Sequence, residues 1–289
     1  MGKSATRITP VRQQGIDCVR LGIEGASVTV SRFGAQVLSW VPADGKERLF
    51  LSERAVVDGT SPIRGGVPIC FPQFSGLGSL PKHGFARIRE WQTTDAADTN
   101  ADLVFSLESD QQTRSLWPHA FAARFAISLS ALGLTMQFSV RNTGDAAFAF
   151  TGALHSYFRI AAIEHVALSG LGGCEYRDAA DADAVRRESN AAIRFEAEVD
   201  RVYHDAPREL VLKTPEGALS IASDGFADTV VWNPGATLCA RMPDMAPDGY
   251  RYMVCVEAAA ARLPVRVLPG QSWTGRQTLT VIPLERSVR

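Results

Sequence analysis

Two side chains of this sequence have the chemistry of a proton acceptor and a proton donor. Glu257 closes the apolar segment YMVCVE, where burial of a carboxylate costs several kcal/mol unless the group is paired or protonated. His155 follows an apolar strand expected at 147–150, and an imidazole ionises near neutral pH. The residues alone leave two other interpretations open: a carboxylate at an exposed strand end, and a hydrogen-bonded core histidine.

A rigid segment rich in cations, RGGVPICFPQFSGLGSLPKHGFAR, occupies residues 64–87. Its basic side chains are Arg64, Lys82, His83 and Arg87. Arginine binds phosphate oxygens in a bidentate manner, and the glycine pair 65–66 would let the backbone approach a ligand closely. The segment has neither a Walker nor a dinucleotide-binding glycine pattern. It therefore predicts a local anion site, with a solvated surface loop as the alternative.

Asp200 precedes Arg201 in the segment EVDRVYHD, and from the residues alone the two are expected to form an ion pair on a surface turn. Three histidines, His83, His119 and His204, follow no common metal-binding spacing, and no helix presents two ligands. The sequence therefore predicts no metal site.

The composition limits the classes of function. The chain of 289 residues has 30 basic and 31 acidic side chains, and its net charge of −1 does not suit a protein that coats nucleic acid or an anionic membrane. The five cysteines are scattered without a CxxC pair, as expected for reduced thiols in the cytoplasm. The sequence shows no secretory signal, and no apolar run reaches the roughly 18 residues of a membrane span.

Alternation of apolar and polar residues with period two predicts an almost entirely β-structured chain. The predicted strands are 27–31, 36–41, 103–108, 124–130, 134–142, 210–213, 218–222, 229–232, 250–257 and 278–282. Turns at 131–133 and 214–217 each close a hairpin, 110–117 forms a short helix, and the polar segment 179–188 is a loop. We therefore expect one domain, residues 1–289, folded as a large antiparallel β-sandwich.

Seven motifs, in order along the chain, resemble the hexose-6-phosphate 1-epimerases of the galactose-mutarotase-like group. They are RGGVPICFPQFSG, PKHGFAR, WPHAF, GALHSYFRI, VDRVYHD, VVWNPG and YMVCVEAA, and they extend from Arg64 to Glu257. The resemblance implies a β-supersandwich and a sugar epimerase that needs no metal or other cofactor. This chain has Lys82 where the family often has glutamine, and Ile88 and Arg89 where asparagine is common.

The resemblance also implies roles for the site residues. His155 and Glu257 correspond to the catalytic pair, and Arg64, Arg87 and Asp200 correspond to substrate-contacting positions. Lys82 and His83 lie in the same predicted binding segment.

The implied reaction explains these residue types. An aldose ring opens when a base removes the proton of the anomeric hydroxyl while an acid protonates the ring oxygen, and rotation about C1–C2 before closure gives the other anomer. Glu257 as a carboxylate would be the base and His155 as an imidazolium the acid, facing each other across a sugar-sized pocket with Asp200 on its rim. The cations of residues 64–87 would bind the 6-phosphate.

We therefore expect a monomeric cytoplasmic enzyme whose partner is a small sugar phosphate, with no nucleic acid and no membrane. Phe71, Phe74 and Trp232 either flank the sugar or belong to the core. Two other classes of function remain open. One is a carbohydrate-binding module without catalysis, and the other is a glycoside hydrolase with Asp200 and Glu257 as its two carboxylates.

Overall fold

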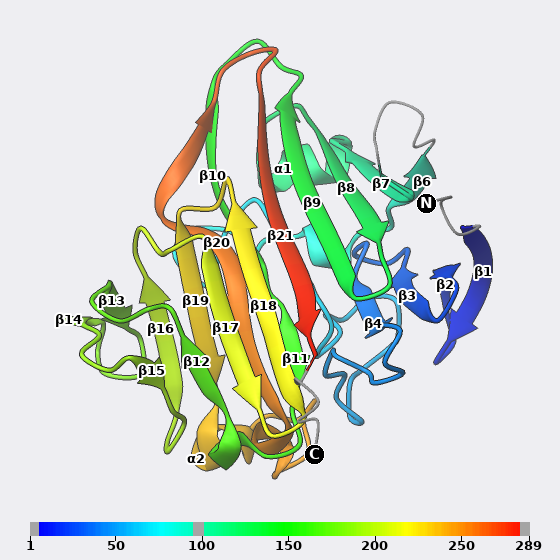
Figure 1. Ribbon diagram of the computed structural model, residues 1–289. Coiled ribbons are helices and arrows are strands. Elements are labelled where there is room, and N and C mark those ends of the chain that lie inside the picture. Colours follow the sequence, from blue (N-terminus) through cyan, green and yellow to red (C-terminus); the bar gives the residue numbers. More distant parts are fainter. Residues whose placement is uncertain (1–5, 95–100, 284–289) are drawn as a thin grey trace.

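The computed structural model describes residues 6–94 and 101–283, and its regular structure is mostly β (Figure 1). The strands form three sheets of nine, eight and four strands. Neighbouring strands pair antiparallel throughout the described part of the chain. The expected all-β fold with large antiparallel sheets is confirmed.

The nine-stranded sheet is built from long neighbouring strands flanked by short ones. In spatial order its strands are β15 (Ala192–Ile193), β12 (Ala167–Ser169), β17 (Glu209–Thr214), β18 (Gly217–Asp224), β21 (Ser272–Ile282), β9 (Gly133–Asn142), β8 (Phe121–Leu129), β7 (Leu103–Glu108) and β6 (Gln92–Thr94). In β9, buried Leu134, Met136 and Phe138 alternate with less buried residues, because one face of the sheet packs into the core. The hairpin turns predicted at 131–133 and 214–217 join β8 to β9 and β17 to β18.

The eight-stranded sheet contains the longest strand, β20. In spatial order its strands are β14 (Ala184–Arg187), β13 (Glu175–Asp178), β16 (Val199–Tyr203), β19 (Asp228–Asn233), β20 (Met253–Val267), β10 (Phe148–Leu154) and β5 (Ile69–Cys70), and β11 (Tyr157–Arg159) also pairs with β20. Alternate residues of β20 face opposite sides. Val254 and Val256 enter the main apolar core, whereas Cys255 joins a separate apolar cluster.

The four-stranded sheet comes from the N-terminal part of the chain. Its strands are β1 (Arg7–Gln13), β2 (Ile16–Ile23), β3 (Ala26–Ser31) and β4 (Val37–Val41). The largest apolar cluster takes side chains from all three sheets, for example Val28 of β3, Phe138 of β9 and Val256 of β20. The sheets therefore share one continuous core, as expected for a sandwich.

Helices are few and short in the described residues. They are η1 (Ala86–Ile88), α1 (Gln111–Leu116), η2 (Ile163–His165), α2 (Gly235–Cys239) and η3 (Gly249–Tyr252). The predicted helix 110–117 is confirmed, and the Asp110 side chain caps it by accepting a hydrogen bond from the Thr113 backbone N–H. Among the described residues, none of the helices has the length and apolar character needed to cross a membrane.

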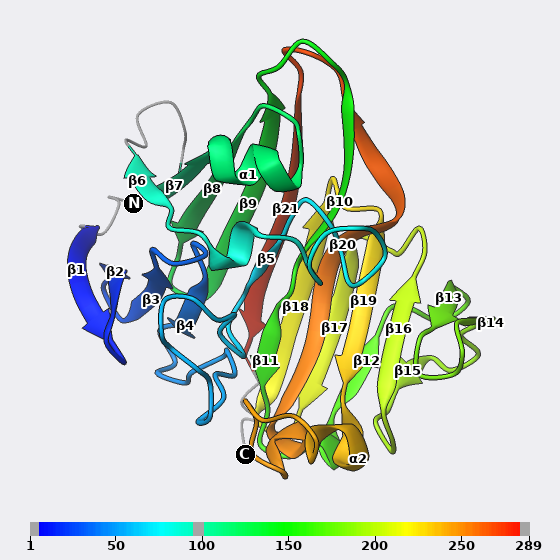
Figure 2. The same cartoon turned by 180° about the vertical axis from the view of Figure 1, so that it is seen from behind.

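Loops cover part of the outer face of the eight-stranded sheet (Figure 2). Figure 2 shows the segment that carries β5 and η1 crossing this side of the molecule, and α2 at the lower ends of the strands. The isolated bridge between Leu51 and Gly65, and the pairing of Ile69 with Leu154, attach the segment to the rest of the fold. A pocket can therefore form between the sheet and its loops.

Two predictions about regular structure were wrong. The segment 179–188, predicted as a loop, contains β14, which pairs with β13 at the edge of the sheet. This strand is largely exposed on both faces, so its sequence shows no apolar alternation. The strand predicted at 250–257 starts at Met253, after η3, and continues to Val267. An alanine run follows Glu257, and it has no polar alternation from which the continuation could be predicted.

The glycine pair 65–66 is buried and is not among the residues that line the pocket around Arg64, Lys82 and Arg87. A Cβ atom on Gly65 would lie 2.4 Å from the carbonyl oxygen of Phe50, and one on Gly66 would lie 2.1 Å from that of Val37. Both residues also have positive φ angles. The glycines are therefore explained by close backbone packing against neighbouring segments, which corrects the interpretation drawn from the sequence.

Gly66→Ala should destabilise the fold much more than Gly45→Ala. Both glycines have left-handed φ angles, of +60° and +77°, but nothing lies within 4 Å of a Cβ on Gly45. Gly45→Ala should cost about 1–2 kcal/mol for the backbone conformation alone. Gly66→Ala should cost about 1–3 kcal/mol more because of the steric overlap. Urea unfolding of both variants measures the difference, and equal losses would contradict the close packing.

Candidate active site

All seven site residues named from the sequence line one pocket of about 580 Å³. They are Arg64, Lys82, His83, Arg87, His155, Asp200 and Glu257. The sheet forms the floor through β16, β19 and β20, while the segment 64–87 and the residues after α2 form the walls. Residues nearly 200 positions apart therefore meet at one place.

Glu257 lies within the central strand of the pocket floor. It is directly opposite Val230 of β19, and only 2% of the residue is exposed. Its side chain leaves the strand on the face opposite to Val256, which points into the main core. The alternative of a carboxylate at an exposed strand end is wrong, because β20 continues for ten residues beyond Glu257.

His155 directly follows β10 and contacts the carboxylate. Its Nδ1 lies 3.3 Å from Oε1 of Glu257, and its ring stacks on Tyr157 at 4.7 Å between centroids. We expected the pair to face each other across the sugar. A contact this short leaves no room for a sugar ring between the two atoms, so the two side chains form one continuous part of the pocket wall.

Burial favours the uncharged form of each member of this pair. Burial raises the pKa of Glu257 well above its usual value, and the neighbouring Asp200 raises it further. Burial lowers the pKa of His155 well below its usual value, and nearby cations, among them Arg64, lower it further. A neutral pair and a carboxylate–imidazolium pair contain the same number of protons, and they differ only in the position of one proton.

A buried hydrogen-bond chain supports the backbone behind the pair. Ser156 donates to Oε1 of Gln277 at 2.5 Å, and Nε2 of Gln277 donates to the Val256 carbonyl at 3.2 Å. Both polar side chains are fully buried, where unpaired polar groups would be costly. The chain links β21 of the opposite sheet to the neighbours of both catalytic candidates. The sequence contained no signal for Gln277, because its position becomes meaningful only once the sheets pack.

His83 is a neutral side chain in the pocket. Its Nδ1 lies 3.2 Å from the Ser75 backbone nitrogen, which donates to it, and 3.2 Å from Sγ of Cys70. Burial, together with the charges of Arg87 and Lys82, lowers its pKa to about 3. Counting His83 among four basic side chains was therefore wrong for the folded state. Because Nδ1 accepts a hydrogen bond, Nε2 carries the proton and acts as a donor.

Arg64 is held by two partners in the pocket wall. Its Nε donates to Oδ2 of Asp244 at 3.0 Å, and its Nη1 donates to the Tyr157 hydroxyl at 2.9 Å. Burial alone lowers the pKa of Arg64, but Tyr157 and Asp244 together raise it above the usual value. The guanidinium keeps further N–H donors for a ligand. It also braces Tyr157, the ring on which His155 stacks.

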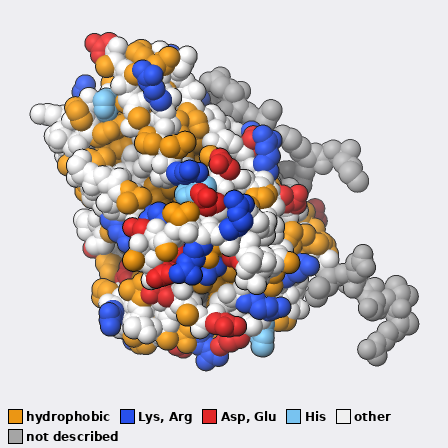
Figure 3. Space-filling view, turned by 90° about the vertical axis from the view of Figure 1, so that its left-hand side faces the viewer, with side chains coloured by type: hydrophobic (Ala, Val, Ile, Leu, Met, Phe, Trp, Pro, Cys, Tyr) orange, Lys and Arg blue, Asp and Glu red, His pale blue; other side chains and the backbone are white. Residues whose placement is uncertain are grey.

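Lys82 and Arg87 are the other predicted cations. Nη2 of Arg87 donates to the Lys82 carbonyl at 2.6 Å, which fixes the two residues relative to each other. Lys82 is exposed, and its charge acts on both Glu257 and Asp200, whose pKa values it lowers. Figure 3 shows a face on which basic, acidic and histidine side chains gather in one central area. A dianionic group would find complementary charge beside Lys82 and Arg87.

Asp200 lies on β16, opposite Trp232 of β19. Its neighbour Arg201 leaves the strand on the other side, where it pairs with Glu188 at 3.1 Å and with Asp178 at 3.4 Å. The predicted ion pair of Asp200 with Arg201 on a surface turn is therefore wrong, because successive strand residues face opposite ways. Asp200 is part of the pocket floor, and burial raises its pKa.

The three aromatic candidates divide between pocket and core. Phe74 and Trp232 line the pocket, while Phe71 is fully buried among other aromatic rings, including Phe121 and Phe138. Sequence reasoning missed several other pocket residues. They are Tyr157, Arg177, Arg241 and Asp244, among others. Tyr157 lies in the motif GALHSYFRI, two positions after His155, and the two rings stack.

The histidines considered for a metal site lie in three different settings. His83 lines the pocket, His119 packs on the Trp117 ring, and His204 lies 3.5 Å from Asp228. Another group, His155, Cys255 and Glu257, brings three potential ligand atoms within 4.8 Å of one another. The sequence argument missed this group because it looked for ligands on a helix, whereas a strand presents residues two apart on one face.

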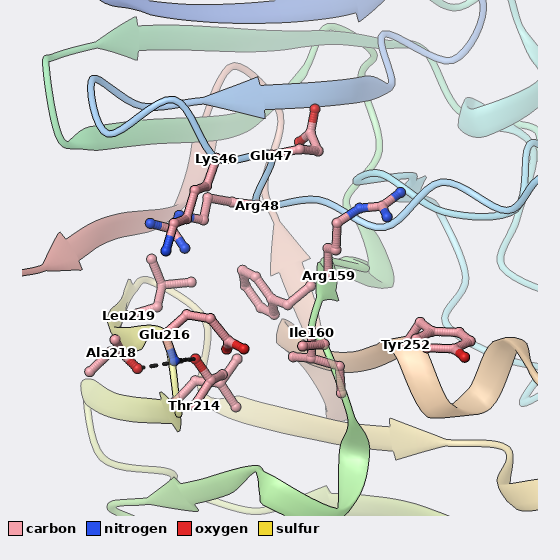
Figure 4. A pocket seen from close by; sticks show the side chains of 14 residues that line it. Lys46, Glu47, Arg48, Arg159, Ile160, Thr214, Glu216, Ala218, Leu219 and Tyr252 are labelled. Atoms are coloured by element: carbon pink, nitrogen blue, oxygen red, sulfur yellow. Dashed lines mark hydrogen bonds between the residues drawn. The ribbon is translucent and has the colours of Figure 1, made fainter.

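A second cavity of about 320 Å³ lies beside β11 and the β17–β18 turn (Figure 4). Lys46, Arg48 and Glu216 are among its lining residues, and none of the seven predicted site residues reaches it. Arg48 is paired with Asp44. The cavity has no contact between a carboxylate and an imidazole, so acid–base chemistry is assigned to the first pocket.

Comparisons with known proteins agree with this architecture. The family described as Aldose 1-epimerase matches residues 17–280. A Cenchrus ciliaris protein named "Putative glucose-6-phosphate 1-epimerase" is 35% identical over 276 residues, 91% of this chain and 83% of that protein. An Escherichia coli protein of the same name is 37% identical over 239 residues, 79% of this chain and 78% of that protein. A Salmonella typhimurium crystal structure, described as a "putative mutarotase", has a TM-score of 0.87 and 29% identity, and covers 96% of this chain and 94% of that chain. The expected galactose-mutarotase-like fold is confirmed.

His83→Asn should reduce the loss of stability at acid pH. An unfolded histidine binds a proton as the pH falls through its ordinary value of 6.5, whereas folded His83 does so only near 3. The free energy of unfolding should therefore decrease as the pH falls through this window, by up to about 1.4 kcal/mol per pH unit. Asparagine suits the φ angle of 65° at this position and offers an acceptor to Ser75.

Urea unfolding across that pH window, compared between the wild type and His83→Asn, measures the effect. His165→Asn is the matched control, because His165 is exposed on η2. The control should keep the wild-type slope. If His83→Asn also keeps it, His83 is not held neutral by the fold.

Proposed function

We propose that this chain, which belongs to the aldose 1-epimerase family, interconverts the α and β anomers of a hexose 6-phosphate, with glucose 6-phosphate as the first candidate. Family membership makes it an isomerase. It therefore disfavours a carbohydrate-binding module and a glycoside hydrolase, the two alternatives left open by the sequence. The observation that carries the proposal is the contact of 3.3 Å between His155 and Glu257, in a pocket that Lys82 and Arg87 also line.

In the proposed mechanism Glu257 takes the proton of the anomeric hydroxyl while His155 protonates the ring oxygen. Burial favours the neutral pair, so in this mechanism the bound sugar must stabilise the carboxylate–imidazolium form, in which Glu257 can accept a proton and His155 can donate one. The number of protons in the pocket then stays constant through the ring-opening step. Water exclusion strengthens the electrostatic interaction between these groups. The proposal includes no metal or other cofactor.

The remaining residues position the sugar. Lys82 and Arg87, with the free N–H groups of Arg64, bind the 6-phosphate in this proposal, because charge-assisted hydrogen bonds to phosphate are the strongest available. Asp200 accepts hydrogen bonds from ring hydroxyls, and His83 donates through Nε2. Trp232 offers an apolar ring surface on the pocket floor. The names of the two relatives, which mention glucose 6-phosphate, support this choice of substrate.

We include in the proposal that the chain acts as one domain and as a monomer in the cytoplasm, without nucleic-acid or membrane partners. The five cysteines are free thiols, which supports a reducing compartment. Elution of the purified protein at the mass of one chain in light-scattering chromatography would agree with a monomer. A mass of two chains would refute that part of the proposal.

Glu257→Gln and His155→Asn should each lower kcat by about 10²–10⁴, the usual contribution of a general acid or base. Both substitutions keep the size and hydrogen-bonding capacity of the side chain, so the fold and the substrate affinity should change little. The double variant should lose less than the product of the two single losses, because both groups act in one step. Anomer exchange measured by NMR, after subtraction of the spontaneous rate, tests this. A folded Glu257→Gln variant with the wild-type rate would refute the mechanism.

Arg87→Ala and Lys82→Ala should lower kcat/KM selectively for the phosphorylated sugar. Loss of one charge-assisted contact, roughly 1.5–3 kcal/mol, corresponds to about tenfold to a hundredfold. Free glucose should lose far less, and added salt should weaken only the phosphorylated substrate. Lys46→Ala, in the second cavity, is the matched control and should affect neither sugar.

Equal losses on both sugars would remove the phosphate assignment from these two residues. Arg64→Ala is a less specific test, because it also leaves Asp244 unpaired and breaks the hydrogen bond to Tyr157. It should therefore lower the rates of both substrates.

A further inference from the structure

We propose that Cys255, together with His155 and Glu257, forms a binding site for a zinc ion, and that zinc bound there blocks the catalytic pair. The binding part of this inference is independent of the proposed function, and the inhibitory consequence rests on it. The site differs from a resident cofactor site, because the metal would occupy the atoms that the reaction itself needs.

The geometry of the three side chains carries the inference. Cys255 and Glu257 are two residues apart on β20, so both leave the strand on its outer face. Their ligand atoms and those of His155 all lie within 4.8 Å of one another, and Nδ1 of His155 is already 3.3 Å from Oε1 of Glu257. Tetrahedral zinc with bonds of about 2.0–2.3 Å separates its ligand atoms by roughly 3.3–3.7 Å. A side-chain shift of about 1 Å would therefore complete the arrangement.

Two atoms of the site make no hydrogen bond to the described residues, although one of them, Nδ1 of His155, lies 3.3 Å from Oε1 of Glu257. Nδ1 of His155 and Oε2 of Glu257 are buried and make no hydrogen bond within the described part of the chain. Both side chains are at least nine-tenths buried, at 9% and 1% exposure. Buried polar atoms are rarely left unpaired unless a ligand or water meets them. These lone pairs are thus available to a metal whenever the sugar is absent.

The ligand set selects the class of ion. A thiolate and an imidazole suit zinc and similar borderline ions, whereas magnesium and calcium prefer oxygen ligands. The thiolate and the carboxylate together neutralise a divalent ion, which a buried site requires. Binding releases the thiol proton of Cys255 to water, and also the proton of Glu257 where that group is protonated. The open pocket leaves the fourth position to water.

The surroundings set limits on the affinity. His155 and Glu257 line the pocket, so an ion reaches them by the route of the substrate. Cys255 is fully buried beside Tyr157, its partner across the strands. Lys82 and Arg87 repel a cation at the pocket wall, and binding therefore depends on the two anionic ligands. Loss of a residue that only hydrogen-bonds to a metal ligand typically weakens metal binding roughly 10–100-fold. Loss of the Cys255 thiolate, which is itself a ligand, should weaken zinc binding at least as much.

The first test measures binding without substrate. Wild type, Cys255→Ser and Cys255→Ala are titrated with zinc against a chromophoric chelator, and with cobalt(II), whose thiolate complexes absorb in the near ultraviolet. Wild type should bind one zinc ion and show the cobalt–thiolate band. Both variants should lose the band and at least about tenfold in zinc affinity. Cys239→Ala is the matched control, because Cys239 is a buried thiol of the same apolar cluster.

The second test measures anomer exchange under the same conditions. Zinc should inhibit the wild type and Cys239→Ala, EDTA should restore both, and magnesium should have no effect. Cys255→Ser and Cys255→Ala should keep their activity at zinc concentrations at least about tenfold higher. Thermal unfolding of each variant establishes that it is folded.

Three results would overturn the inference: no zinc binding to the wild type, a cobalt spectrum without a thiolate band, or equal zinc affinity in wild type and Cys255 variants. A wild type that binds zinc through Cys255 but does not exceed the spontaneous exchange rate would refute the proposed function and leave the metal site standing. Loss of activity with EDTA, restored by zinc, would show that the ion is needed rather than inhibitory.

Discussion

The contact between His155 and Glu257 imposes the main constraint on this structure. Two ionisable groups are buried side by side, and each is costly in its charged form unless the other, or a ligand, compensates. The surrounding fold meets this requirement with fixed partners. Tyr157 stacks on the imidazole, and Arg64, itself held by Asp244, donates a hydrogen bond to the Tyr157 hydroxyl. Gln277 supports the backbone from the opposite sheet. This pair is thus held by contacts from both layers of the sandwich rather than by its own hydrogen bonds.

The long strand β20 explains how one sheet serves both core and site. Its alternate residues separate two environments, with Val254 and Val256 in the main core and Cys255 and Glu257 beneath the pocket. The neighbouring strands add Asp200, Val230 and Trp232 to the same outer face, because directly opposite residues of antiparallel strands share a face. Loops then supply the cations. The sheet therefore places the carboxylate–imidazole pair, and the loops place the cations of the pocket wall.

Much of this arrangement was predictable from the sequence, and the failures have physical causes. Period-two alternation located β9 and β18 because each has one buried face. It missed β14, which is exposed on both faces, and the second half of β20, where an alanine run hides the alternation. The motifs identified residues that line the pocket, but not their charges or their hydrogen-bond partners. The neutral His83 and the occupied guanidinium of Arg64 depend on burial and on Asp244, 180 positions away. The roles of Gly65 and Gly66 were misread because a glycine pattern does not reveal whether a ligand or another backbone segment lies close to it.

The bond between Arg64 and Asp244 has a consequence for how the protein reaches its native state. It closes a loop of 180 residues, and the pocket also needs β10, β16 and β20 in place. Contacts so distant in sequence form late, since the entropy of loop closure must first be offset by other structure. A partly folded chain, including one still emerging from the ribosome, therefore has no assembled pocket. Binding capacity appears only with the complete fold, and any ligand of the pocket therefore stabilises finished molecules rather than folding intermediates.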